Sequence, residues 1–384
     1  MTATIVPQKT EYSEADHLYM AVELSRARWR LALSRGGEKI RRVWVEAGDG
    51  DALLRQLEAA KKDFELAAEA SVRSCYEAGR DGFWVHRLFT QLGIENLVID
   101  AASMKVSRRR RRAKNDRLDA DQLLVDLVRH HRGDADVWKV VRVPPPRAED
   151  LRRIPRQLER LKKERRQHRG RLLSLFATVG ANVTPSTLNR RLRNLDAVRC
   201  WDGRELAPCL RLEIEHESER LALVSRQIAK LEAFEKEVAS WDQPEGQKVH
   251  RLVQLRGVGL DSACLLVFEL FGWREFRNRK QVGSIAGMCS TPYNTGDSER
   301  EQGISKAGLA RVRTRMVELS WLWLRNQPHS ELSRWFHKRY GEGGSRARRV
   351  GTVALARKLL VQLWRYVELG VVPPGAQLMT IQPK

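Results

Sequence analysis

The chain has 384 residues, enough for two or three domains, and a formal net charge of +22 spread along its whole length. This excess of positive charge favours the phosphate backbones of nucleic acids as partners, through counterion release and long-range steering. No amphipathic anchor and no apolar run of about 20 residues suggests a membrane partner, and residues 1–11 lack a signal-peptide core. We therefore expect a cytoplasmic, nucleoid-associated bacterial protein. The five cysteines form neither zinc spacing nor a disulfide framework, so we expect reduced, structural thiols.

Three strand-like runs followed by strand–helix alternation predict a mixed α/β domain over residues 15–143. The expected strands are 18–24, 28–34, 40–46, 72–76 and 96–99, and the expected helices are 51–61, 82–92 and 116–130. This order fits a mixed sheet covered by helices. The ribonuclease H-like fold, to which RuvC-like domains belong, is one arrangement of this kind.

A run of cations leads directly into two carboxylates. The cations are Arg108, Arg109, Arg110, Arg111, Arg112 and Lys114. Asp116 and Asp119 follow, and their spacing places them on one face of a helix. Two clustered acids repel each other unless a cation lies between them, whereas the arginines would attract a polyanion. The pairing indicates chemistry on nucleic acid.

Two further carboxylates end predicted strands. Glu23 ends the first strand and Glu77 follows the run 72–76. Divalent metals that serve phosphoryl transfer prefer several carboxylate oxygens, so Glu23, Glu77, Asp116 and Asp119 together predict a site for Mg²⁺ or Mn²⁺. Each of these acids, considered alone, is explained more simply as a helix cap or a surface residue. Asp121 and Asp126 fall on other faces of the predicted helix.

The proline run after Val143 predicts a linker, and residues 147–240 predict a helical arm. Apolar residues recur at helical spacing in two stretches, which suggests an antiparallel coiled coil. They are Leu151, Ile154, Leu158, Leu161, Leu172 and Leu175, then Ile214, Leu221, Val224, Ile228, Leu231 and Val238. Pro155 indicates a kink or a late helix start. A solvated spacer is the simpler interpretation, and an arm for dimerisation or for gripping nucleic acid is the functional one.

Residues 248–372 predict a helical domain. Arg256, Gly257 and Gly259 lie between two apolar runs, a helix–hairpin–helix-like pattern whose turn can bind phosphate. The tryptophan-rich runs 312–323 and 353–364 predict core helices. Between them and the turn, residues 286–308 predict a polar loop rich in hydroxyls and close to Arg300, Lys306, Arg311 and Arg313. Such a hydroxyl could attack a phosphodiester beside these cations, although an ordinary surface loop fits the same composition.

The chain resembles the DEDD transposases of bacterial insertion sequences, which are related to pilin-gene invertases and include bridge-RNA-guided recombinases. The resemblance rests on residues 114–120 and 290–308, with a weaker match at Glu77-Ala78-Gly79. It covers nearly the whole chain. It implies a RuvC-like domain, a coiled coil and a helical transposase domain in that order.

The resemblance also implies roles for single residues. The family's acidic tetrad falls on Glu23, Glu77, Asp116 and Asp119, with glutamate where aspartate is usual at the first position. Its nucleophilic serine precedes a glycine, and the matching residue here is Thr295. The β-methyl group of threonine restricts χ1 and crowds an attack. Three alternatives stay open: Thr295 is the nucleophile, Ser298 replaces it, or the enzyme is impaired.

The reaction that the resemblance implies is DNA recombination at a composite site, completed by two subunits of a dimer or tetramer. A loop hydroxyl would form a covalent 5′-phospho-enzyme link, and a structured bridge RNA would select donor and target DNA by base pairing. Two alternatives remain. One is a RuvC-type metal-dependent endonuclease that uses water. The other is an inactive nucleic-acid-binding relic.

Overall fold

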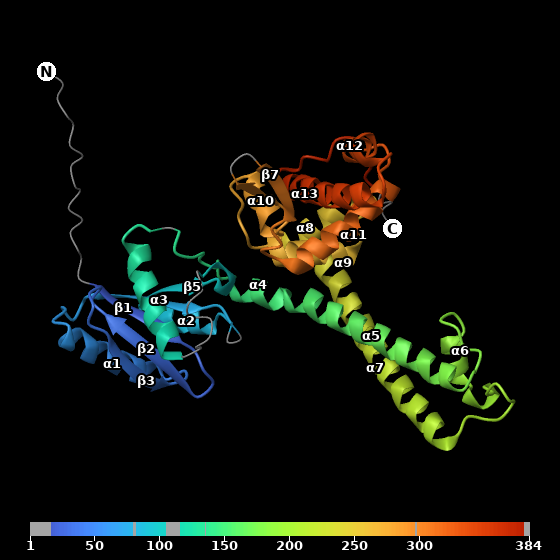
Figure 1. Cartoon of the computed structure of the whole chain (residues 1–384), viewed down its shortest axis with the longest axis horizontal. Coiled ribbons are helices and arrows are strands. Elements are labelled where there is room, and N and C mark those ends of the chain that lie inside the picture. The colour runs from blue at the N-terminus through green and yellow to red at the C-terminus, as the bar shows by residue number, and fades with distance from the viewer. Residues whose placement is uncertain (1–16, 80–81, 105–115, 135, 296–297, 380–384) are drawn as a thin grey trace. The chain divides into compact units, whose positions relative to one another are not determined.

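A computed structural model describes residues 17–79, 82–104, 116–134, 136–295 and 298–379 (Figure 1). The side chains of residues 102, 116–119 and 292–302 are outside this description. Contacts divide the chain into two compact units, Met1–Val143 and Pro144–Lys384, each with apolar clusters of its own. The predicted boundary between 147–240 and 248–372 falls within the second unit and stays a prediction.

The first unit contains one mixed five-stranded sheet. Its strands are β1 (His17–Glu23), β2 (Arg28–Ser34), β3 (Arg41–Glu46), β4 (Ser71–Glu77) and β5 (Glu95–Ile99), in the spatial order β3-β2-β1-β4-β5. β1 pairs antiparallel with β2 and β2 with β3, whereas β4 runs parallel to β1 and to β5. Its helices are α1 (Gly50–Asp63), α2 (Trp84–Gln91) and α3 (Asp116–His131), with a short 3₁₀ turn η1 at Ala101–Ser103. The predicted α/β class is confirmed, and the sheet is compatible with a RuvC-like domain.

Alternation along the strands separates the two faces of this sheet. Met20, Val22 and Tyr76 face one apolar cluster, which also holds the buried residues of α1 and α2. Ala21 and Cys75 face the other cluster, whose helical residues all belong to α3. One face of the sheet is therefore covered by α1 and α2, and the other by α3.

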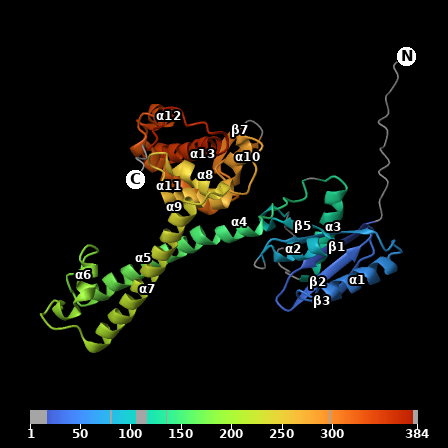
Figure 2. The ribbon, with the colours of Figure 1, turned by 180° about the vertical axis from the view of Figure 1, so that it is seen from behind.

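The second unit begins with a helical arm. α4 (Pro146–Leu151) is followed by α5 (Arg153–Thr178), the short helices α6 (Leu188–Arg193) and η3 (Leu195–Ala197), and α7 (Pro208–Ala239). The first half of α5 packs on the second half of α7, and the last turns of α5 pack on the first turns of α7. The two long helices are therefore antiparallel (Figure 2). Pro155 lies in the first turn of α5, which matches the late start that its position predicted.

Apart from two strands described below, the rest of the second unit is helical, as predicted. It comprises α8 (Pro244–Val253), α9 (Leu260–Leu266) with the π-helical turn η4 (Val267–Phe271), α10 (Arg279–Ile285), α11 (Ala310–Asn326), α12 (Glu331–Tyr340) and α13 (Ser345–Leu369). Trp323 is 1 % exposed and its Nε1 donates to Ser330 Oγ at 2.9 Å, so it is a core residue. Among the described residues, no helix combines the length and the apolar character needed to cross a membrane.

The predicted polar loop differs in the structure. Residues 290–304 form an antiparallel hairpin, β6 (Ser290–Thr295) and β7 (Ser298–Ile304). The polar sequence shows no alternation of apolar and polar residues, which is the pattern that signals a half-buried strand. The two strands form through backbone hydrogen bonds to each other, which cannot be predicted from the amino-acid composition of the segment.

Glu235 of α7 is buried without a salt bridge among the described residues. It is 1 % exposed, and its Oε1 has no hydrogen-bond partner. Burial, with the negative charges of Asp261 and Glu232 adding to it and Lys162 opposing, raises the pKa of Glu235 to about 7. The folded chain therefore keeps a proton that the unfolded chain loses above about pH 4.3, and its stability falls as pH rises from there to about 7.

We expect Glu235→Gln to stabilise the protein, because the amide carries no charge to bury. The gain should be about 2 kcal/mol larger at about pH 8 than at about pH 5. Urea unfolding at both values measures it. Glu237→Gln, an exposed acid on the same helix, is the matched control and should show no such difference. Equal gains at both pH values would contradict the assignment.

Candidate metal centre and nucleophile hairpin

Glu23 and Glu77 end two neighbouring parallel strands. The strand register pairs Val22 with Tyr76, and each glutamate is the next residue along its strand. Residues at matching positions of parallel strands share a face. Glu23 is two residues after Ala21, and Glu77 is two residues after Cys75. Side chains two residues apart on a strand share a face, so both glutamates belong to the face that α3 covers. Glu23 is half-buried and Glu77 is exposed.

The direction of α3 places its first turn at the same edge. Near its carboxyl end, His131 contacts Tyr19, close to the start of β1, with ring centroids 5.9 Å apart. Midway, Cys75 Sγ donates to the Leu123 carbonyl at 3.8 Å. Asp119 precedes Leu123 by about 6 Å of helix, and Glu77 follows Cys75 by about 6.6 Å of strand. The backbone that carries Asp116 and Asp119 thus lies towards the strand ends that carry the glutamates.

Two other acids of α3 have protein partners. Asp121 accepts from Arg42 of β3 at 3.0 and 2.9 Å, and this hydrogen-bonded carboxylate raises the pKa of Arg42. Asp126 pairs with Arg129 one turn along, at 3.4 Å. The Asp121 ion pair ties α3 to the edge of the sheet. Asp121 lies on another face than Asp116 and Asp119, as the sequence placed it. Asp126 follows Asp119 by seven residues, about two turns, and therefore lies on nearly the same face, contrary to that prediction.

Arg30 is a residue of this face that the sequence reasoning missed. It lies directly opposite Glu23 in the β1–β2 pairing and is only 8 % exposed. Its guanidinium carbon lies 5.5 Å from the centroid of Trp44. A buried cation beside the candidate carboxylates could balance them or contact a phosphate. Only the strand register, which sequence composition does not reveal, places it there.

The donor set suits a hard divalent cation. Two strand ends and one helix turn bring carboxylate oxygens to one edge of the sheet, and Mg²⁺ and Mn²⁺ prefer such ligands. No cluster of three His, Cys, Asp or Glu is found within the described side chains, a set that excludes those of Asp116 and Asp119. The metal site therefore stays a prediction.

The hairpin of the second unit carries the candidate nucleophiles. Thr295 and Ser298 form the last backbone pair of β6 and β7, opposite each other at its closed end. The root is tightly packed, because a Cβ at Gly287 or Gly308 would collide with a backbone carbonyl of the other segment. Arg313 locks it further by donating to the carbonyl oxygens of Ala286 and Lys306 at 2.9 and 3.1 Å.

Several predicted nucleic-acid contacts have internal partners or lie outside the described part of the chain. Arg311 pairs with Glu159 of α5 at 2.5 Å, and the Arg256 guanidinium donates to Gln377 at 3.2 Å. Gly257 has a φ of +93° and Gly259 caps α9, while Lys306 is exposed. Outside the described residues or side chains lie Arg108, Arg109, Arg110, Arg111, Arg112, Lys114 and Arg300.

The chain is similar to known transposases. A family model described as "Transposase IS116/IS110/IS902 family" matches residues 249–334, which include the hairpin. "Putative transposase y4rJ" of Sinorhizobium fredii is 39% identical over 383 residues, covering 94% of this chain and 95% of that protein. "Putative transposase y4qE" of the same organism is 27% identical over 314 residues, covering 82% and 73%. The "Transposase for insertion sequence element IS1328" of Yersinia enterocolitica is 25% identical over 130 residues, covering 33% and 38%.

The similarity to the first relative extends through both units and covers nearly all of each chain. The class of protein is therefore a transposase. The chain belongs to the insertion-sequence transposases, in the IS116/IS110/IS902 family.

Proposed function

We propose that this transposase cuts and rejoins DNA at a site built from the carboxylates of the first unit, which is RuvC-like, and a hydroxyl of the hairpin. One observation carries the proposal. Glu23 and Glu77 end adjacent parallel strands on the face covered by α3, whose first turn contributes Asp116 and Asp119. These four residues would hold Mg²⁺ or Mn²⁺, which when bound polarises the scissile phosphate and stabilises the leaving oxygen.

The hairpin supplies the nucleophile in this proposal. The hydroxyl oxygen of Thr295, or of Ser298, bonds to the scissile phosphorus while the bond from phosphorus to the 3′ oxygen breaks. The hydroxyl proton passes to solvent, and the 3′ oxygen takes up a proton. The enzyme is then joined to the 5′-phosphate. A 3′-hydroxyl of the partner strand reverses these bond changes and releases the hydroxyl side chain.

The partners follow from charge and from the family resemblance. Donor and target DNA, together with a structured guide RNA, are polyanions that a net charge of +22 would attract. The carboxylates and the hairpin belong to different units of one chain, so a dimer or tetramer could complete each site with a second copy. Sequencing the RNA that co-purifies with the protein tests the guide, and the lack of any specific small RNA would contradict it.

The nucleophile can be tested by trapping the covalent link. DNA labelled at the 3′ end of the cut strand should give a protein band that resists SDS, whereas label at the 5′ end should not. We expect Thr295→Ala to remove this band, and Thr295→Ser to keep it and raise its rate a few-fold, because the β-methyl group is gone. Ser298→Ala should leave the band unchanged.

The opposite pattern, with the band lost in Ser298→Ala and kept in Thr295→Ala, would move the nucleophile to Ser298. Metal-dependent cutting without any covalent band would contradict the hydroxyl mechanism and favour a RuvC-type nuclease. Neither cutting nor a band in the unmodified protein, with its DNA binding intact, would indicate the inactive relic.

A further inference from the structure

A basic groove lies between α10 and α13 of the second unit, and its lining includes neither Thr295 nor Ser298. Its cavity has a volume of about 1060 Å³. The two helices pack against each other in the second unit (Figure 1). Five cations line it: Arg279, Lys280, Arg357, Lys358 and Arg365. No aspartate or glutamate is among the lining residues.

These five cations lack counter-charges. All are exposed, and none has an ion pair with any described residue. Lys358 has only the ring of Trp335, with its Nζ 4.7 Å from the centroid. Other cations of the same unit do have counter-charges, as with Arg152 and Arg156 on Glu269. Five unmatched positive charges around one cavity repel one another and create a positive potential that a polyanion would relieve.

The groove also offers apolar and polar surface between the cations. Leu332, Val361, Trp364 and Leu369 contribute apolar side chains, and the ring of Trp364 packs edge-on against Phe276. Gln362 contributes a buried Oε1 that has no hydrogen-bond donor. An aromatic ring and an unsatisfied amide are the groups that contact the face and the edge of an unpaired nucleobase.

We propose that this groove binds a single-stranded segment of nucleic acid, with its phosphates on the five cations and a base against Trp364 and Gln362. A duplex keeps its bases stacked and paired, so it could use the cations but not the surface between them. The aspartates and glutamates of an acidic peptide could meet the cations, but they carry no planar ring to match that surface. The shared chemistry is a phosphodiester strand with unpaired bases, and either DNA or RNA could supply it.

The groove adjoins the candidate nucleophile hairpin. Cys289 lines the groove, and Ser290, the next residue, begins β6. A strand held here would pass the root of the hairpin that carries Thr295 and Ser298. This inference deepens the proposed function and relies on it only for the fate of the bound strand. Binding needs neither metal nor cleavage, so its failure and the failure of the proposed reaction can be told apart.

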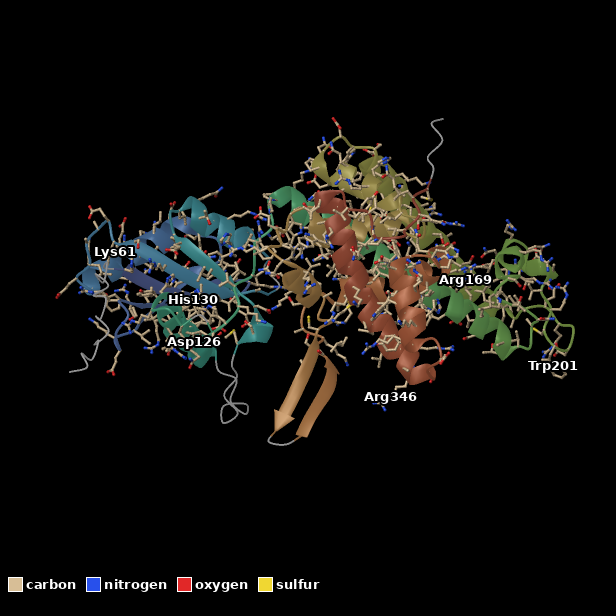
Figure 3. All side chains as sticks on the ribbon, turned by 90° about the horizontal axis from the view of Figure 1, so that it is seen from above. Lys61, Asp126, His130, Arg169, Trp201 and Arg346 are labelled. Atoms are coloured by element: carbon tan, nitrogen blue, oxygen red, sulfur yellow. The ribbon has the colours of Figure 1, made fainter. Side chains whose placement is uncertain are left out.

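Charge reversal tests the cations. We expect Lys280→Glu with Arg357→Glu to weaken binding of a fluorescent single strand of about 12 nucleotides by about tenfold or more. The salt dependence of log K should lose roughly 0.7 for each cation removed. The matched control is Arg325→Glu with Arg346→Glu, two exposed arginines outside the groove lining. Arg346 is labelled in Figure 3. Equal losses in both variants, at equal melting temperature, would show diffuse attraction and overturn the proposal.

Cys289 gives a local readout inside the groove. In a Cys200→Ser, Cys209→Ser background the other two thiols, Cys75 and Cys264, are buried, so modification by a maleimide reports Cys289. A single strand should slow this modification several-fold, and the Lys280→Glu, Arg357→Glu variant should lose the protection. If DNA protects Cys289 more strongly than RNA of the same sequence, or the reverse, the stronger one is the kind of strand that the groove binds. Protection by a duplex or an acidic peptide alone, or no protection at all, would overturn the proposal.

Discussion

Asp119→Asn lowers the rate of DNA cutting and joining by about 10²–10³-fold in the expected result, with little change in stability. Asparagine keeps the shape of the side chain and removes the negative charge that a divalent metal needs. Glu77→Gln should have an effect of the same size, because Glu77 ends the strand towards which the first turn of α3 lies. A strand-transfer assay in Mg²⁺ measures both variants, and Mn²⁺ titration by calorimetry measures the loss of metal affinity.

The control for this prediction lies on the same helix. Asp126 of α3, labelled in Figure 3, pairs with Arg129, so Asp126→Asn makes the same chemical change away from the first turn. We expect it to keep nearly full activity. Normal recombination by Asp119→Asn would show that the metal assignment is wrong, whatever the hairpin does. Loss of activity in all three variants with lowered melting temperatures would point to folding instead.

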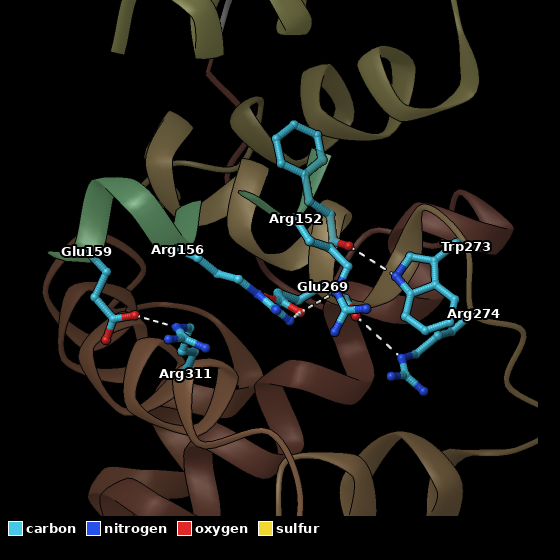
Figure 4. A network of polar contacts seen from close by, with 8 residues as sticks. Arg152, Arg156, Glu159, Glu269, Trp273, Arg274 and Arg311 are labelled. Atoms are coloured by element: carbon cyan, nitrogen blue, oxygen red, sulfur yellow. Dashed lines mark hydrogen bonds and ion pairs between the residues drawn. The ribbon is translucent and has the colours of Figure 1, made fainter. Parts of the chain in front are cut away.

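Glu269→Ala destabilises the protein by about 3–5 kcal/mol in the second expected result. Glu269 is 2 % exposed, and its carboxylate accepts from Arg152 at 2.9 Å and from Arg156 at 2.6 and 3.0 Å (Figure 4). Arg152 also lies over the ring of Trp273, with its Cζ 5.2 Å from the centroid. Removing the carboxylate leaves two arginines, one of them buried, without a counter-charge where α5 meets the helical core. Urea unfolding measures the change.

The same network offers a surface control. Glu159 of α5 pairs with Arg311 at 2.5 Å, but both side chains are substantially exposed (Figure 4). An exposed pair contributes about 0–1 kcal/mol, so Glu159→Ala should change the free energy of unfolding by no more than that. If the two variants were equally mild, the buried network would not hold α5 to the core.

The pH dependence of the Glu269 network has a definite sign. Burial alone would raise the pKa of Glu269, but the hydrogen bonds and positive charges of Arg156 and Arg152 outweigh it and hold the pKa below its ordinary value. The folded state therefore binds this proton less readily than the unfolded state. The stabilisation is fully present above about pH 4.3 and is lost as pH falls through the folded pKa. In Glu269→Ala, this dependence of the free energy of unfolding on pH should disappear.

Local sequence patterns were enough to predict the strands and helices of the first unit, together with two glutamates at strand ends. Strand-like and β-rich runs predicted all five strands, and helical patterns predicted the three helices, within a few residues, since such patterns are local properties of the chain. They also placed Glu23 and Glu77 at strand ends. Their common face follows from parallel pairing of β1 with β4, which local sequence does not specify.

Long-range pairing decided the rest. It made a hairpin of a polar stretch without strand periodicity, and it placed Arg30 opposite Glu23. It also decided which cations have a partner within the protein and which do not, although they look alike in the sequence. Arg311 and Arg313 are engaged by Glu159 and by backbone carbonyls, whereas Lys280 and Arg357 line a groove without counter-charges. A sequence gives the number of charges, but only the tertiary structure decides which of them meet a partner, because partners come from segments far apart in the chain.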